Sequence, residues 1–146
     1  MSRLGCIGAI AVVLLGLGMG CVTQARQPKL SEAMITPARL KPGDTALITV
    51  RLDDRHGIVG RVQGVVNEDT QLVFELHDDG EKGDVKAGDG IWSLWVDVPF
   101  LAPKGEFQFE LTAYDSKGRP IPVRDLERGT VPLTATFTAT VDYPAE

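Results

Sequence analysis

Residues 131–141 read V-P-L-T-A-T-F-T-A-T-V, and from Leu133 to Val141 every apolar residue is followed by a threonine until the segment ends. Successive side chains of a β-strand point to opposite faces of the sheet. The segment therefore predicts a strand with one buried face and one solvent-exposed face. This period of two is the clearest indication that the chain has an all-β fold.

The same alternation occurs in four earlier stretches, each bounded by Gly, Pro, Asn or Asp turn residues. These stretches are residues 45–52, 71–77, 91–98 and 105–113. A first strand near residues 35–40 and a weaker one at 58–66, with Gly60 and Gly64 suggesting a bulge or a sheet edge, bring the total to about seven. The pattern predicts an immunoglobulin-like antiparallel β-sandwich over residues 34–146.

The composition is that of an ordinary folded chain. It has 146 residues, 43% hydrophobic and 24% charged, which fits one domain plus an export segment. The net charge of −5 argues against nucleic acid as a partner, because phosphate binding needs a concentrated basic surface. The only cysteines, Cys6 and Cys21, lie before the predicted domain, which excludes a disulfide or a cysteine-ligated metal within it.

The N-terminus has the character of an export signal. Arg3 precedes an apolar run over residues 7–19, whose length suits a signal-peptide core and is short for a membrane-spanning helix. The run ends at Gly20-Cys21, and polar residues follow from Thr23.

This boundary resembles a bacterial lipobox, although Gly18 stands where leucine is usual. The resemblance implies that residues 1–20 are a signal peptide cleaved before Cys21, and that a lipid on Cys21 anchors the chain without spanning the bilayer. Residues 21–33 are then the lipidated N-terminus and a tether. Val22 in place of aspartate implies the outer membrane in a Gram-negative cell. An ordinary secretory signal, which would leave a soluble protein, is the alternative.

Three segments resemble bacterial immunoglobulin-like and fibronectin-III-like domains. Residues 36–50 are similar to the first two strands of such domains, and residues 105–118 to their penultimate hairpin. Residues 78–92, D-D-G-E-K-G-D-V-K-A-G-D-G-I-W, match a D-D-G-x-x-G-D-x-x-A-G-D-G-x-aromatic loop of exported modules. The resemblance implies the architecture but no particular activity, and the core disulfide of antibody domains is missing.

The acidic loop over residues 78–90 is the main candidate for a ligand site. Calcium binds carboxylate and carbonyl oxygens, and glycines allow a loop to wrap closely around an ion. The candidate ligands are Asp78, Asp79, Asp84 and Asp89, with Glu81 less favoured. The spacing is not that of an EF-hand, and Asp and Gly also build rigid turns without any ion. A calcium site and a purely structural loop are both open.

The two tryptophans are predicted to point to opposite faces of one strand. Trp92 is in register with Leu94 and Val96 and belongs to the core, whereas Trp95 lies on the other face. An exposed aromatic residue on a sheet stacks on sugar rings or contacts a protein, so Trp95 is the candidate binding residue. The alternative is that residues 115–124 cover it.

Catalytic motifs are missing from the sequence. No serine lies in a G-x-S-x-G elbow, and no phosphate-binding glycine loop occurs. A zinc site from His56 and His77 with a carboxylate is a minor alternative. These features favour a protein that is not an enzyme.

The favoured function is a non-catalytic lipoprotein of the cell envelope whose domain serves adhesion, scaffolding or complex assembly. Its expected partners are the membrane, through the lipid on Cys21, and an envelope protein or polysaccharide. Calcium is the one cofactor that the sequence suggests. A carbohydrate-binding module that uses Trp95 is the second hypothesis, and a small metal-dependent hydrolase is the third.

Overall fold

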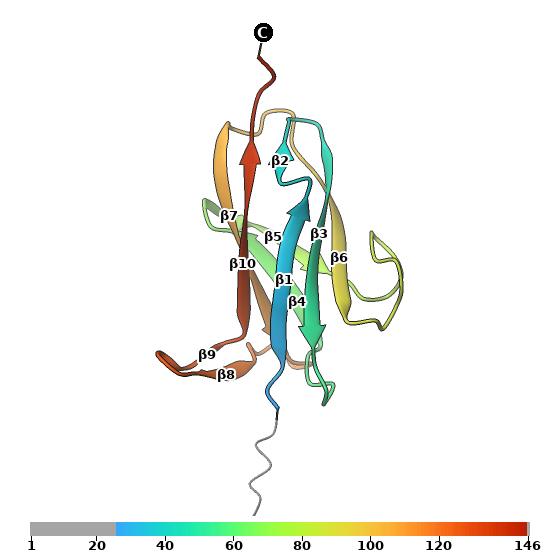
Figure 1. The fold of residues 1–146 in the computed structure, drawn as a ribbon, viewed down its shortest axis with the longest axis vertical. Helices are drawn as coiled ribbons and strands as arrows, with labels where there is room; N and C mark the ends of the chain where they lie inside the picture. The colour runs from blue at the N-terminus through green and yellow to red at the C-terminus, as the bar shows by residue number, and fades with distance from the viewer. Residues whose placement is uncertain (1–25, 146) are drawn as a thin grey trace, which may run out of the picture.

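The computed structural model describes residues 26–145, and every helix or strand in that range is a β-strand (Figure 1). The prediction of an all-β fold is therefore confirmed. The strands are β1 (Lys29–Thr36), β2 (Arg39–Leu40), β3 (Thr45–Asp53), β4 (Arg61–Val66), β5 (Asp69–Leu76), β6 (Ile91–Asp97), β7 (Gly105–Tyr114), β8 (Pro122–Asp125), β9 (Gly129–Pro132) and β10 (Thr134–Val141).

The long strands form two sheets. One has the order β1-β3-β6 and the other the order β2-β10-β7-β4-β5, while β8 and β9 form a separate hairpin. All pairings are antiparallel except the short parallel contact between β2 and β10. The described residues contain ten strands rather than about seven, because β2, β8 and β9 are too short to show a period in the sequence.

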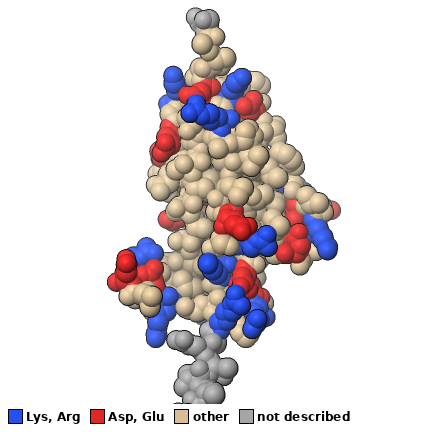
Figure 2. Space-filling view, in the orientation of Figure 1, with Lys and Arg blue, Asp and Glu red and all other residues tan. Residues whose placement is uncertain are grey.

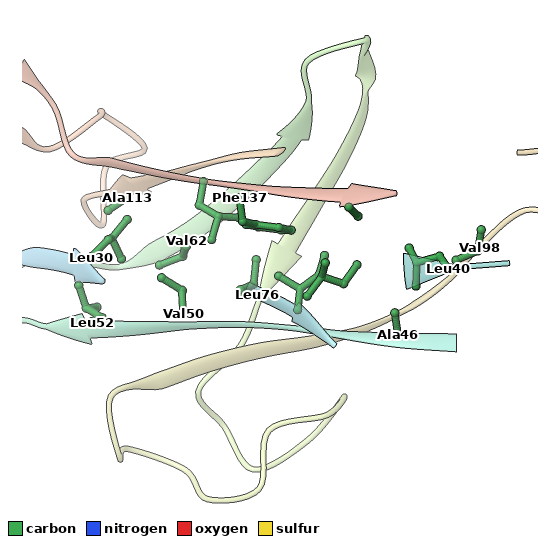
Figure 3. Packing of buried hydrophobic residues seen from close by; sticks show 14 of the residues in the cluster. Leu30, Leu40, Ala46, Val50, Leu52, Val62, Leu76, Val98, Ala113 and Phe137 are labelled. Carbon is green, nitrogen blue, oxygen red and sulfur yellow. The ribbon is translucent and has the colours of Figure 1, made fainter. Parts of the chain in front are cut away.

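The core lies between the two sheets, which face each other across it (Figure 3). Its largest fully buried side chains come from both sheets, and they are Ile48, Val50, Val62, Leu76 and Leu111. Phe109 and Phe137 stack on neighbouring strands with ring centroids 4.8 Å apart. The predicted alternation is confirmed in β3, where every second residue from Ala46 to Leu52 is buried.

Two expectations about individual strands are wrong. β1 begins at Lys29, so residues 29–33 belong to this strand and not to the tether, and residues 29–31 pair with β3. A register shift between Ser31 and Met34 interrupts the alternation there and hides the strand in the sequence. Leu72 is 54% exposed rather than buried, because β5 lies at the edge of its sheet and the core extends only to Phe74.

β4 lies between β7 and β5, so it is an internal strand and not an edge. A register shift between Val65 and Val66 does place an irregularity in its pairing with β5. Gly64 is buried within this strand, opposite Leu111 on one side and Phe74 on the other.

Different strands lie at the two ends of the molecule. β1 starts beside the β8–β9 hairpin at the lower end in Figure 1, and β10 finishes at the upper end. The loop between β5 and β6 projects from the side of β6 (Figure 1). Across residues 26–145, no helix has the length and apolar character needed to cross a membrane.

Candidate functional site

The acidic loop connects the two sheets, since β5 belongs to the five-stranded sheet and β6 to the three-stranded one. Two backbone hydrogen bonds between His77 and Ser93 hold the strands together where the loop leaves them. The loop then turns back to β6, where Trp95 N donates a 2.9 Å hydrogen bond to Lys82 O. The loop is therefore fixed to the edge of β6 at its base and at its middle.

Three of the four predicted metal ligands come together in this loop. Asp78, Asp84 and Asp89 each offer a carboxylate oxygen, and the three oxygens lie within 4.8 Å of one another. Two oxygens bound to one calcium ion at about 2.3–2.6 Å are at most about 5 Å apart. The spacing of the three carboxylates therefore fits a calcium ion. Asp84 is only 7% exposed, and it would be the inner ligand.

Hydrogen bonds within the loop support the structural role of the same carboxylates. Asp78 accepts from Gly88 N at 2.9 Å and from Gly90 N at 3.2 Å, which closes the loop across its base. Asp84 accepts from Gly80 N at 2.7 Å. A carboxylate oxygen has two lone pairs, so it can accept a backbone hydrogen bond and still bind a cation.

The remaining acidic residues of the loop have separate places. Asp79 accepts a 3.0 Å hydrogen bond from Glu81 N and stabilises a local turn. Neither Asp79 nor Glu81 belongs to the group of three carboxylates. In the part of the chain that the structure describes, this group is the one metal-ligand cluster, and it includes neither His56 nor His77. Cys21, the predicted lipidation site, lies outside the described residues.

Trp95 lies beside this loop on the outer face of the three-stranded sheet. It is 53% exposed, whereas Trp92 packs against the core, so the predicted division of the two tryptophans is confirmed. A β-carbon at Gly83 would come within 2.8 Å of Trp95 Cδ1. The neighbour of the indole ring is therefore the acidic loop, and not residues 115–124.

The cross-strand neighbours of Trp95 extend this surface. Leu47 is directly opposite Trp95, and Thr36 of β1 is opposite Leu47. In the next row, Met34 pairs with Thr49. Met34 and Thr36 are exposed, and Leu47 and Thr49 are partly so. We define the binding face as Met34, Thr36, Leu47, Thr49 and Trp95.

Sequence reasoning missed Leu47 and Met34. Leu47 falls on the polar side of the alternation in β3, between Thr45 and Thr49. An apolar residue on the wet face of a strand was the available signal. Met34 could not be placed in this way, because the register shift in β1 separates it from any simple period.

Comparisons with known proteins show a shared fold and no family. A scan against protein-family models found no match, and a search of the curated proteins found none. Among solved structures, the chain is similar to the endo-beta-1,4-mannanase from Thermotoga petrophila, with a TM-score of 0.51 and 17% identity over 84% of this chain. The chain spans 21% of that enzyme's length, so the likeness concerns one part of it. At this identity the similarity shows the β fold alone.

Proposed function

We propose that the chain is a non-catalytic, lipid-anchored module of the cell envelope, and that its immunoglobulin-like sandwich binds a partner in adhesion, scaffolding or complex assembly. Cys21 carries the lipid, and the outer membrane is the location in a Gram-negative cell. The observation that supports the binding role is the position of Trp95, which is half-exposed on the binding face. The acidic loop beside it is held to β6 by the hydrogen bond from Trp95 N to Lys82 O.

A tryptophan that remains half in water leaves a large apolar area unburied, and such residues recur as anchors of interfaces. Trp95 does not stand alone, because Leu47 and the exposed Met34 lie on the same face. The face is part of a regular sheet, so its side chains need little reordering to meet a partner. These features favour recognition of a macromolecule over chemistry on a small substrate.

Carbohydrate recognition is the second candidate. Trp95 offers a ring for stacking, and Thr36 and Thr49 on the same face offer hydroxyl groups that donate and accept hydrogen bonds. The similar solved structure is named as a mannanase, which is a reason to include mannans among the polysaccharides tested.

The acidic loop serves this surface as a support. The proposal assigns calcium to Asp78, Asp84 and Asp89 as a stabilising ion, because their carboxylates have the required spacing. A bound ion would neutralise three clustered negative charges and hold residues 80–84 against Trp95.

The proposal is tested by photo-crosslinking in intact cells. One variant carries a photoreactive residue in place of Met34 on the binding face. A second variant carries the same residue in place of Leu126, which is fully exposed on the β8–β9 hairpin. The proposal is supported if position 34 crosslinks to an envelope protein and position 126 does not. Adding Trp95→Ala to the variant at position 34 should remove these crosslinks. Identical products from both positions contradict the proposal.

Retention on a polysaccharide panel tests the second candidate. Trp95→Ala should lose retention, while Phe100→Ala, which removes an exposed aromatic ring in the loop between β6 and β7, should keep it. Equal retention of both variants and the unaltered chain would exclude carbohydrate recognition through Trp95.

A further inference from the structure

A hollow of about 540 Å³ lies at the end of the molecule where β1 begins, between the chain that leads into β1 and the β8–β9 hairpin. Figure 2 shows Lys and Arg side chains at this lower end, interspersed with acidic ones. Four basic residues line the hollow, and they are Arg26, Lys29, Arg124 and Arg128. Two acidic residues, Asp53 and Asp125, line it as well.

Both carboxylates of the lining are already paired. Arg26 contacts Asp53 at 2.9 Å. Arg128 contacts Asp125 at 3.2 Å. The hollow therefore has no negative charge left to compensate its other two basic residues.

Lys29 and Arg124 provide the surplus positive charge. Neither forms an ion pair with any residue in the described range 26–145. Both are exposed. A chain with a net charge of −5 thus has a local excess of cations at this one end, and that excess favours an anionic partner.

The walls of the hollow are held in place by the side chain of Gln27. Its Nε2 donates to Arg124 O at 3.4 Å, and its Oε1 accepts from Arg124 N at 2.5 Å. The side-chain amide thereby pairs with the backbone of β8 as a neighbouring strand would. The segment before β1 and the hairpin form one preformed surface.

Apolar side chains line the same hollow. Leu30 is buried, and Val123 and Val131 are partly buried, at the base of the two walls. A site with cations beside apolar groups matches an amphiphile that has an anionic head, such as a phospholipid.

The position of the hollow in the chain points to the membrane. Arg26 is five residues after Cys21, and five extended residues span at most about 18 Å. A lipid on Cys21 would therefore keep Arg26 within about 18 Å of the anchored residue, so the cations at this end of the domain can reach the headgroups.

We infer that this end of the domain is a docking surface for the anionic phospholipid headgroups of the membrane, with Lys29 and Arg124 as the contacting cations. The inference rests on the proposed lipid anchor at Cys21. Docking there fixes the long axis of the domain relative to the bilayer. It also leaves the binding face on the side of the molecule free for its partner.

Vesicle sedimentation of the full chain carrying Cys21→Ser tests the inference without the lipid. The vesicles are phosphatidylcholine, alone or with about 30% phosphatidylglycerol. Neutral vesicles report the contribution of the apolar residues 7–19. We expect a preference for the anionic vesicles that is lost at about 0.5 M salt. Adding Lys29→Gln with Arg124→Gln should lower anionic-vesicle binding roughly tenfold or more.

The matched control is Arg39→Gln with Lys104→Gln, which neutralises two exposed cations outside the hollow. It should keep the preference for anionic vesicles, and unchanged melting temperatures show that both double variants fold. Equal losses in the two double variants, or no preference for anionic vesicles, would overturn the inference. Mass spectrometry of the unaltered chain tests lipidation of Cys21 separately, so a failed anchor and a failed docking surface are told apart.

Discussion

The indole ring of Trp95 lies against the backbone of Gly83, so closely that a β-carbon at position 83 would be 2.8 Å from Trp95 Cδ1. The same β-carbon would also be 2.8 Å from Leu47 Cδ1. The acidic loop and the binding face are therefore one structure, in which the path of the loop determines how the tryptophan is presented.

Gly83→Ala should displace the loop from the sheet. Gly83 has φ +105°, a conformation that L-residues rarely adopt, and the new methyl group would overlap two side chains. We expect the free energy of unfolding to fall by about 1–3 kcal/mol, with a change in tryptophan fluorescence. Chemical denaturation and emission spectra measure the two effects.

Gly88→Ala is the control for this variant. Gly88 also has positive φ, +73°, but nothing lies within 4 Å of its would-be β-carbon. Its free energy of unfolding should fall by only the roughly 1 kcal/mol that backbone strain costs. The fluorescence of Trp95 should stay unchanged. Equal spectral changes in both variants would show that contact with the indole ring is unimportant.

Millimolar calcium should raise the melting temperature of the chain. An ion that binds only the folded state stabilises it by mass action, by about 2.7 kcal/mol at a hundred times its dissociation constant. Asp84→Asn should abolish the effect, because it removes one charge from the group of three while its amide oxygen can still accept from Gly80 N. Differential scanning calorimetry with and without calcium measures the shift.

Asp79→Asn is the matched variant for calcium, since Asp79 is in the same loop but outside the group of three. It should keep the calcium-dependent shift in full. If the unaltered chain shows no shift, the hydrogen bonds of Asp78 and Asp84 to the loop backbone are sufficient to hold it.

Asp115 should make stability depend on pH in the acid range. The hydrogen bond from the backbone N–H of Arg119, together with the side chain of Arg119 and the N–H of Lys117, holds the pKa of Asp115 below its ordinary value of 3.8. A pKa that is lower in the folded state stabilises the fold above the unfolded-state pKa. This stabilisation is lost as the pH falls through the folded-state pKa.

The measurement is urea unfolding at neutral pH and at several values below 3.8, the ordinary pKa of this group. In Asp115→Asn the free energy of unfolding should fall less between neutral and acid pH, because this position no longer titrates. Arg119→Gln keeps the backbone N–H, which is the largest cause, so NMR titration should find the pKa of Asp115 still lowered, but by less. A pKa at or above the ordinary value in the unaltered chain would contradict the assignment.

The faces of most strands could be predicted because period-two alternation is a local property of the sequence. It identified the buried sides of β3, β7 and β10 and separated Trp92 from Trp95. It failed for β1, where a register shift near Glu32, which has φ +54°, breaks the alternation. Alternation also cannot show which strands lie at an edge, and so it wrongly predicts that Leu72 is buried.

The candidate site was predictable only in part, for a related reason. The residue types of the acidic loop indicated carboxylate ligands, but which of them converge depends on the path of the backbone. Asp78 and Asp89 are eleven residues apart and meet because the loop closes on itself. The contact between Gly83 and Trp95 depends on the loop folding back over β6, for which the sequence has no periodic signal.

Gly64→Ala should destabilise the fold through Phe74. Gly64 lies in the middle of β4, and a β-carbon there would be 2.2 Å from Phe74 Cζ and 2.8 Å from Leu111 Cδ2. The Phe74 ring covers the glycine and meets Phe109 edge to face at 6.2 Å, so it cannot move without losing that contact. We expect the free energy of unfolding, measured by chemical denaturation, to fall by about 1–3 kcal/mol.

A double-mutant cycle with Phe74→Ala tests this explanation. Phe74→Ala vacates the space that the new methyl group needs, so adding Gly64→Ala to it should cost less than Gly64→Ala alone. We expect a coupling energy of about 0.5–3 kcal/mol. Additive losses in this double-mutant cycle would show that the ring moves aside freely and that glycine is not required beneath it.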